Sequence, residues 1–472
     1  MMKKFIYTII AIAFLGSLSS CGKDALDPTL AQEKDVATSI NTADDLQGLL
    51  LGAYDRITTT AYYGRDVIII GTIRADESFS DANSGRFQPE TEMDMLITSA
   101  TVGDTWAQIY RVIASANILI GIDVANITGD AAQINHIIGQ AYALRALGHY
   151  DLLRIYGQQH VTGGNGVGIP YIKTYKGGPE TLLPTRNTVA ECKQFIMEDL
   201  ATAASMMSAG LNDPSRQYMT TYGAQALAAR VALYFEDWAT AKTMANAVIS
   251  SGAYSICPAD QYAASWKTDG GVNSIFELAY SGTDNNNING LSQIFRGNAY
   301  GDIRALPELL SIFDPNDVRG GTVGGKAMID WDPDPTKSFK LRNMGKYPSA
   351  DYSDNIPLIR YEEVILIYAE AALETGDAGT ALTYLNMLTS KRNANAFTVA
   401  TKANILLERK RELVFEGFRF DDLARTHSDI PLISELQKHG GPAYGSYNYA
   451  FPIPQAELLA NSNMVQNVGF TN

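Results

Sequence analysis

The chain has 472 residues, of which 46% are hydrophobic and 19% are charged, which is the usage of an ordinary globular protein. Its formal net charge at pH 7 is −14, and runs of Lys and Arg, such as Lys3-Lys4 and Arg409-Lys410-Arg411, are short and few. Binding of nucleic acid requires clustered cations that neutralise phosphates, so this composition argues against a nucleic-acid ligand.

The N-terminus has the pattern of an export signal. An apolar run over residues 5–15 suits the core of a signal peptide and is too short for a transmembrane helix of roughly 20 residues. The Leu-Ser-Ser-Cys sequence that ends at Cys21 resembles a bacterial lipobox. This resemblance implies a lipoprotein signal peptide over residues 1–20, lipidation of Cys21 and a polar tether over residues 21–31. An ordinary secretory signal with a chance Cys is the alternative.

Helical spacing of apolar residues dominates the chain after the tether. Apolar residues recur at three- and four-residue intervals over residues 46–54, 106–120 and 141–151. The third of these helices is expected to end before Gly157. No further apolar run is long enough to span a bilayer, so a lipid on Cys21 would be the contact with the membrane.

Two segments look like copies of one helical hairpin. They cover residues 222–251 and 362–391, and each is interrupted by a short acidic turn that contains Asp237 or Asp377. Small residues occupy matching positions in both copies, which is typical of a tetratricopeptide-like hairpin. The helices near Trp106 and Ala141 could pair in the same way. We therefore predict an all-α-dominated fold with tetratricopeptide-like hairpins as its scaffold.

Two long irregular excursions interrupt the helical pattern, at about residues 62–99 and 255–346. Loops this long are uncommon in a compact domain and are usually functional. Exposed aromatic rings in them could cover the apolar face of a sugar or a peptide side chain, while polar groups satisfy its edges. The candidate ligand-binding residues are Tyr62, Tyr63, Asp76, Phe79, Asn83, Arg86 and Phe87 in the first excursion, and Trp266, Asn285, Asn286, Asn287, Arg296, Tyr300 and Trp331 in the second.

The C-terminal third carries a long charged motif. Residues 408–425 read ERKRELVFEGFRFDDLAR. This stretch resembles the E-R-x-x-E-L-x-F-E-G-x-R-x-x-D-L-x-R run of the SusD/RagB family of outer-membrane nutrient-binding lipoproteins, at every fixed position. Thr426 stands where the family often has Trp, and Val468 replaces the usual Pro near the end. Further similar stretches lie in the family's order at residues 142–157, 314–319, 358–371 and 451–470.

The resemblance covers about the whole mature chain and implies its architecture and role. It implies a single SusD-like domain over residues 32–472, built on helical hairpins with the excursions packed against them. It also implies an outer-membrane lipoprotein that faces the cell surface and partners a TonB-dependent (SusC-like) barrel transporter. Members of the family bind oligosaccharides in many cases and peptides in some. The resemblance implies no enzymatic activity and no cofactor.

The charged residues of this motif lie at three- and four-residue spacings, which are ion-pair spacings on a helix. We interpret them as a structural network; the alternative is a pair of glycosidase carboxylates. The set consists of Glu408, Arg409, Glu412, Glu416, Arg419, Asp422 and Arg425.

Other signals for chemistry are weak. The five His residues are scattered, and no zinc-protease, nucleophile-elbow or phosphate-loop motif is present. The acidic runs at residues 314–317 and 330–334 could ligate Ca²⁺, although Asp and Asn beside Pro and Gly more often form turns. Cys192 and Cys257 are too few for a disulfide scaffold and are expected to be unpaired, mostly buried thiols.

Four functions remain open at this point. The leading hypothesis is capture of oligosaccharide for an outer-membrane transporter, and the second keeps the fold with a peptide or another nutrient as cargo. A protein-binding scaffold and a surface glycosidase are the others. The sequence does not choose between sugar and peptide, because aromatic platforms serve both.

Overall fold

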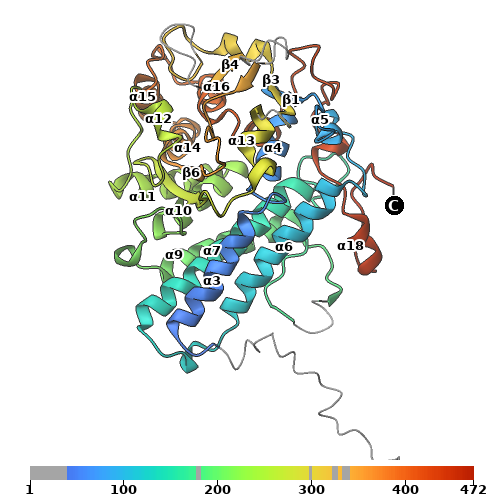
Figure 1. The fold of residues 1–472 in the computed structure, drawn as a ribbon, viewed down its shortest axis with the longest axis vertical. Helices are drawn as coiled ribbons and strands as arrows, with labels where there is room; N and C mark the ends of the chain where they lie inside the picture. Colours follow the sequence, from blue (N-terminus) through green and yellow to red (C-terminus); the bar gives the residue numbers. More distant parts are fainter. Residues whose placement is uncertain (1–39, 177–181, 297–299, 321–327, 332–340, 472) are drawn as a thin grey trace, which may run out of the picture.

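The computed structural model describes residues 40–176, 182–296, 300–320, 328–331 and 341–471. Long helices dominate it (Figure 1), as the spacing of apolar residues predicted. The predicted signal peptide, Cys21 and most of the tether lie outside the described residues. The longer helices are α3 (Ala43–Ile57), α6 (Ala100–Ile120), α7 (Ala131–Tyr156), α9 (Val189–Met206), α10 (Thr221–Tyr234), α11 (Trp238–Ser250), α14 (Tyr361–Glu374), α15 (Ala378–Ser390) and α16 (Lys402–Leu413).

Four of these helices form the lower part of the molecule. Helices α3, α6, α7 and α9 run side by side, with α7 packed between α6 and α9 (Figure 1). Helix α7 begins where the side chain of Asp130 accepts a hydrogen bond from the backbone N–H of Gln133, and it ends before Gly157 as predicted. The helix is buried over most of its length because neighbours cover both of its faces.

The two predicted hairpins are α10–α11 and α14–α15. Asp237 and Asp377 sit at the breaks, and each accepts a hydrogen bond from the N–H of a Thr three residues later, Thr240 or Thr380. These contacts cap the N-termini of α11 and α15, so both copies turn by the same device. Helix α11 packs on α14, which joins the two hairpins into one scaffold. The prediction of tetratricopeptide-like hairpins is confirmed.

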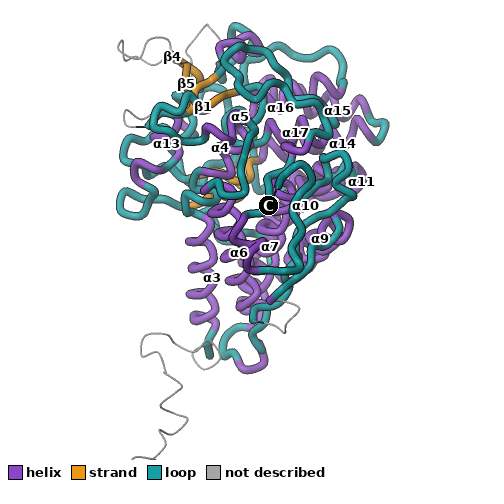
Figure 2. The backbone as a smooth tube through the Cα atoms, turned by 90° about the vertical axis from the view of Figure 1, so that its right-hand side faces the viewer, coloured by secondary structure: helices purple, strands orange, loops and turns teal. Residues whose placement is uncertain are grey.

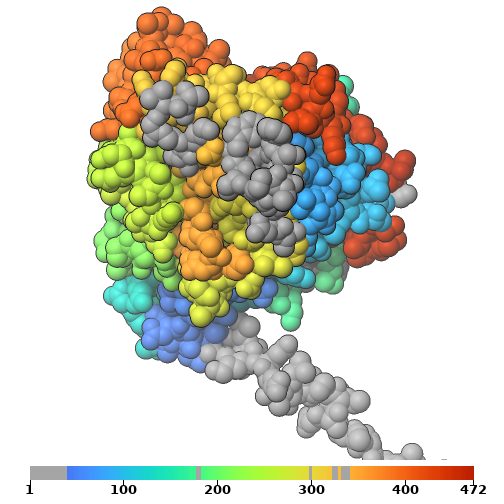
Figure 3. Space-filling view, turned by 45° about the horizontal axis from the view of Figure 1, so that its top comes forward, coloured from blue at the N-terminus to red at the C-terminus, as the bar shows by residue number. Residues whose placement is uncertain are grey.

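Short strands join segments that are distant in the sequence. Strand β1 (Ser78–Ser80) pairs with β3 (Ile303–Ala305), β2 (Ser274–Leu278) with β6 (Ile356–Arg360), and β4 (Ile329–Trp331) with β5 (Leu341–Asn343), all antiparallel. The β1–β3 pair links the two predicted excursions. In the space-filling view the second excursion, yellow, covers the centre of the face, and the first, light blue, lies to its right (Figure 3).

The first excursion is less irregular than its composition suggested. It contains α4 (Asp66–Ile73), an apolar helix whose residues are all buried, and the short α5 (Gln88–Glu92). Figure 2 shows these two helices beside β1, with α16 and α17 (Arg419–Arg425) to their right. The remaining short elements are α12 (Tyr262–Ser265), α13 (Leu291–Arg296), α18 (Gln455–Ala460) and the 3₁₀ turns Val124–Asn126, Ala209–Leu211, Asn287–Asn289, Pro307–Ile312 and Tyr447–Tyr449.

Candidate functional site

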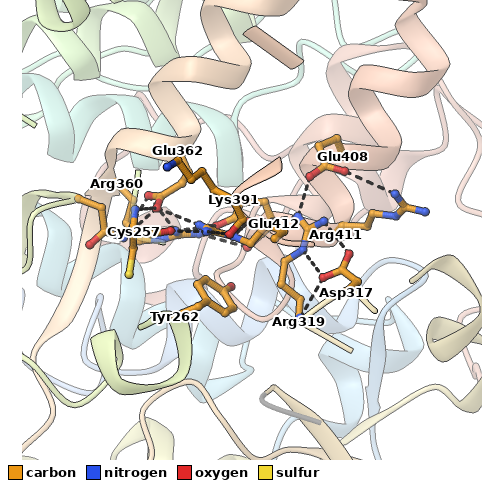
Figure 4. A network of polar contacts seen from close by, with 12 residues as sticks. Cys257, Tyr262, Asp317, Arg319, Arg360, Glu362, Lys391, Glu408, Arg411 and Glu412 are labelled. Atoms are coloured by element: carbon orange, nitrogen blue, oxygen red, sulfur yellow. Dashed lines mark hydrogen bonds and ion pairs between the residues drawn. The ribbon is translucent and has the colours of Figure 1, made fainter. Parts of the chain in front are cut away.

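The charged C-terminal motif lies inside the protein as a network of ion pairs (Figure 4). Glu412, at the end of α16, is fully buried and accepts hydrogen bonds from three arginines of distant segments. Its donors are Arg319 at 3.1 Å, Arg360 at 2.9 Å and Arg392 at 2.8 Å. Arg319 also reaches Asp317 and Glu408, and Arg392 also reaches Glu362.

The ionisation of Glu412 follows from these partners. Burial alone would raise the pKa of its carboxyl, but Arg392 and Arg360 hold that pKa far below the usual range. The carboxylate therefore stays charged and fully engaged by guanidinium groups. Removing one partner of such a buried pair typically costs about 3–5 kcal/mol of stability, which fits a structural joint. The structural interpretation of the motif is confirmed, and its carboxylates are not placed for a glycosidase.

The second half of the motif anchors α17 and the first excursion. Asp422 accepts hydrogen bonds from both Arg409 and Arg425, and Arg425 also pairs with Glu370 of α14. Arg419 reaches the carboxylate of Asp76, a distance of 2.6 Å.

Asp76 was predicted to contact ligand, and that expectation is corrected by its burial. Only 4% of its surface is exposed, and its two oxygens are occupied by Arg419 and Lys410. Burial would raise the pKa of Asp76, but the hydrogen bonds and charges of these two cations lower it to about 2. Its carboxylate holds the excursion onto the motif.

The expectation of exposed rings is also wrong for most of the aromatic candidates. Tyr62 and Tyr63 are buried, and both hydroxyls donate to the carboxylate of Asp151 on α7. Trp266 is buried against the cations of Lys346 and Arg360. Phe79 and Phe87 are buried as well, because the excursions fold over apolar layers of their own.

Three of the predicted residues do come together on the surface, where the excursions meet. The guanidinium of Arg86 lies over the ring of Tyr300, 3.9 Å from its centre. Nδ2 of Asn83 donates to the carbonyl oxygen of Tyr300 at 2.6 Å. Asn83 is exposed, and the other two are half-buried. We call these three residues the Arg86–Tyr300 patch.

Residues that the sequence did not single out hold this patch in place. Asp302 is fully buried and accepts hydrogen bonds from the backbone N–H and the hydroxyl of Ser84, at 2.6 and 2.7 Å. The same hydroxyl accepts from Arg86 at 2.8 Å. Because Asp302 precedes β3 and Ser84 follows β1, the β1–β3 pair sets the geometry. No local pattern in the sequence could have shown a contact between such distant residues.

The other polar candidates are used by the protein itself. The side-chain amides of Asn285 and Asn286 donate to the carbonyl oxygens of Ser281 and Thr58, and Arg296 donates to that of Lys346. Asn287 begins the short 3₁₀ turn Asn287–Asn289 and has a left-handed backbone, with φ of 49°. The backbone of Trp331 ends β4, and its side chain lies outside the described residues.

A hollow of about 580 Å³, most of it open solvent at its mouth, lies where α4, α7, α10 and α17 meet, with Tyr63 and Phe418 in its walls. Its arginines are engaged within the protein: Arg154 pairs with Asp421, and Arg230 pairs with Glu363. The aromatic and charged walls are therefore part of the packing between the helical scaffold and the motif.

The described part of the chain holds no group of three or more His, Cys, Asp or Glu side chains that could bind a metal ion. Within the Ca²⁺ candidates, Asp317 pairs with Arg319, while residues 332–334 lie outside the described ranges. No described helix has the length and apolar character needed to cross a membrane. Cys192 and Cys257 are free and buried, as predicted.

Known protein families match this chain in two regions. Residues 334–470 match the model of the SusD family, and residues 28–233 match a model described as starch-binding associating with outer membrane. The chain belongs to the SusD/RagB family. The charged motif at residues 408–425 lies within the first of these matches. The proteins of this family bind ligands without catalysis, so the prediction that this protein is not an enzyme is confirmed.

Relatives cover the chain from end to end. SusD-like protein P2 of Formosa agariphila is 25% identical over 99% of both chains. Starch-binding protein SusD of Bacteroides thetaiotaomicron is 30% identical over 33% of this chain and 28% of its own. The crystal structure of a SusD superfamily protein from Bacteroides vulgatus has a TM-score of 0.82 and 28% identity, and the match covers 92% of this chain and 100% of that one. The predicted SusD-like fold is confirmed.

Proposed function

We propose that this protein is a cell-surface lipoprotein that captures oligosaccharide at the Arg86–Tyr300 patch and delivers it to a TonB-dependent barrel transporter. Three relatives or models carry glycan names: the starch-binding family model, the starch-binding protein SusD, and surface glycan-binding protein A of Bacteroides fluxus, whose 20% identity supports the fold alone. The observation in this chain that carries the proposal is the arrangement of Arg86, Tyr300 and Asn83 at the meeting of the excursions.

The chemistry of the patch suits a sugar. A flat ring covers the apolar face of a pyranose, and guanidinium and amide groups bond its hydroxyls. One ring and a few hydrogen bonds correspond to about −4 to −8 kcal/mol, or millimolar to micromolar binding. Such an affinity suits a receptor that must pass its cargo on. A peptide is the second candidate, because the same ring can cover an apolar side chain.

Native mass spectrometry of the purified protein with one pool of neutral oligosaccharides and one of oligopeptides tests the proposal. We expect retention of sugar, and at least about tenfold weaker binding for Arg86→Ala and Tyr300→Ala, which is 1.4 kcal/mol. Tyr175→Ala is the matched control, because the exposed Tyr175 has the ammonium of Lys176 5.4 Å from its ring centre and lies away from the excursions. Retention of peptides alone, or of neither pool, would contradict oligosaccharide capture.

Anchoring and delivery have separate tests. Cys21→Ser should abolish incorporation of labelled fatty acid and move the protein from the membrane fraction to the soluble fraction, since the sulfur carries the proposed lipid. Wild-type protein solubilised in mild detergent should co-purify with a barrel transporter. Unchanged lipid labelling of the variant would contradict the anchor, and purification without any barrel would contradict the partnership.

A further inference from the structure

An apolar surface lies around α18, at the right edge of Figure 1 and on the side that faces the viewer in Figure 2. It is formed by the chain leading into α6, the chain leading into α9 and the C-terminal segment, which are residues 95–103, 182–190 and 451–471. We call it the Leu459 surface, and its exposed apolar residues are Leu96, Leu183, Leu459, Val465 and Val468.

Hydrogen bonds hold these three segments together. Nδ2 of Asn463 donates to the carbonyl oxygen of Leu183 at 2.7 Å. The backbone N–H of Gln455 donates to the carbonyl oxygen of Ile97 at 3.0 Å. The exposed apolar side chains therefore stand on a surface that is fixed by its own contacts, and not on a loose chain end.

Charge is nearly absent from the Leu459 surface. Its three segments contain Arg186 and Glu457 as their only charged residues, whereas 19% of the whole chain is charged. Both are engaged within the protein, since Arg186 donates to the carbonyl oxygen of Val465 and Glu457 accepts from the indole N–H of Trp106. Depletion of charge marks the centre of a protein–protein interface, and a contiguous exposed apolar patch marks an interaction site.

Acidic residues border this surface. Asp94, Asp104 and Glu191 lie directly beside the three segments and are exposed. The rim of an interface is polar, and its charges favour a partner of opposite sign. A second copy of this chain would bring a second acidic rim and a net charge of −14 against the first, so repulsion opposes a homodimer. The surface suits a different protein, apolar at its centre and bordered by Lys or Arg.

The surface begins near the proposed sugar site. Arg86 and Leu96 both belong to the first excursion, and the chain between them limits their separation to about 35 Å. A protein docked on the Leu459 surface would therefore stand beside the Arg86–Tyr300 patch, which is where a protein that receives the cargo is needed.

The membrane below the anchor is a poorer occupant. The described chain enters α3 beside the α6–α7 connection, where Thr42 forms a bridge with Thr128. Leu96 precedes the opposite end of α6, a helix about 30 Å long. The Leu96 end of the surface thus lies far along the scaffold from the point where the chain leads to the proposed lipid.

We propose that the barrel transporter docks on the Leu459 surface. This inference rests on the proposed function, which supplies a partner that must take sugar from the neighbouring Arg86–Tyr300 patch. Docking would remove Leu459 and Val465, which are 80% and 67% exposed, from water. It would also hold the sugar site beside the transporter.

Val465→Glu and Leu459→Glu in the full-length lipoprotein test this surface. Each variant is purified from outer membranes in mild detergent, and the TonB-dependent barrel that accompanies it is quantified by mass spectrometry. We expect at least about tenfold less barrel than with wild type, because docking would bury an unpaired carboxylate. Val399→Glu is the matched control, since Val399 is 56% exposed and lies between α15 and α16.

The variants should be altered in docking alone. Substitution of exposed side chains should leave the melting temperature of all three near that of wild type. Their affinity for oligosaccharide should also equal that of wild type, because none of the substituted residues belongs to the Arg86–Tyr300 patch.

Each outcome decides a different point. Wild-type recovery of the barrel by Val465→Glu and Leu459→Glu would overturn the docking surface and leave the proposed delivery intact. Absence of a barrel from the wild-type preparation would overturn both. Wild-type dimers that Val465→Glu dissociates would assign the surface to a second copy and overturn the proposal. So would binding of Cys21→Ser protein to phosphatidylethanolamine–phosphatidylglycerol vesicles, if Val465→Glu abolished it.

Discussion

His160 is a half-buried imidazole whose charge state couples the free energy of unfolding to pH. Its Nε2 lies 3.0 Å from the hydroxyl of Tyr234, and its Nδ1 lies 3.3 Å from that of Tyr444. Burial, aided by the charge of His427, lowers the pKa of His160 from 6.5 to about 3. Below pH 6.5 the imidazole of His160 is protonated in the unfolded chain but stays neutral in the folded protein. The contribution of His160 to the free energy of unfolding is therefore fully present above pH 6.5 and is lost as the pH drops toward 3.

Replacing His160 by Gln should flatten this dependence. The amide of Gln can still contact Tyr234 but has no proton to gain. As the pH falls from 6.5 to 5, we expect wild-type protein to lose up to about 1.4 kcal/mol per pH unit more than His160→Gln. The free energy of unfolding, measured with urea at pH 7, 6 and 5, checks this. Parallel curves for the two proteins would show that His160 titrates alike in both states.

Helix α4 and the charged motif approach each other closely at one point, where the backbone of α4 crosses the turn at Gly417. A Cβ added at Gly71 of α4 would lie 2.0 Å from the carbonyl oxygen of Gly417. Gly417 itself has φ of 84°, and a Cβ there would lie 2.9 Å from Cα of Ile68. Two glycines thus let the buried helix touch the turn between α16 and α17. This contact places β1, which follows α4, against the motif.

Gly71→Ala should destabilise the protein by about 1–3 kcal/mol or more, because backbone must move to admit one methyl group. Gly48→Ala is the control, since Gly48 is an exposed glycine within α3 with nothing near its added Cβ. That variant should be stabilised by up to about 1 kcal/mol, as alanine favours helix. Thermal and urea unfolding of both variants measure the difference. Equal stability of Gly71→Ala and wild type would show that the contact between α4 and Gly417 has room for a methyl group.

Sequence predicted those elements whose signals are local. The Asp237 and Asp377 turns repeat at matching positions, so both hairpins were predicted with their breaks. Helix α4 was not, because an eight-residue apolar run shows no helical periodicity when every face is buried. The three-residue strands were not predicted either. Their partners, such as Phe79 and Arg304, are far apart in the chain and carry no local signature of pairing.

The candidate site was predicted only in part, for a related reason. Arg86 and Tyr300 were chosen separately, and tertiary structure alone shows that they touch. Trp266 and Tyr62 were chosen as exposed rings, but exposure depends on what the rest of the chain places over them.

The whole molecule is a helical scaffold closed by two excursions that share one charged joint. Arg319 lies within the second excursion and Arg360 lies shortly after its end, and both reach Glu412. Strand pairing between β1 and β3 then brings the first excursion against the second. At the proposed Arg86–Tyr300 patch, Asp302 and Ser84 hold Arg86 through hydrogen bonds, which would limit the entropy lost when a sugar binds.

A crystal structure of the protein grown with a neutral oligosaccharide tests this account most directly. We expect an ordered sugar beside Arg86 and Tyr300, with its hydroxyls within hydrogen-bond distance of the Arg86 guanidinium. The side chains of the charged motif should not contact the sugar. An ordered sugar on another face of the molecule, or one held by Glu408 and Glu412, would contradict the account.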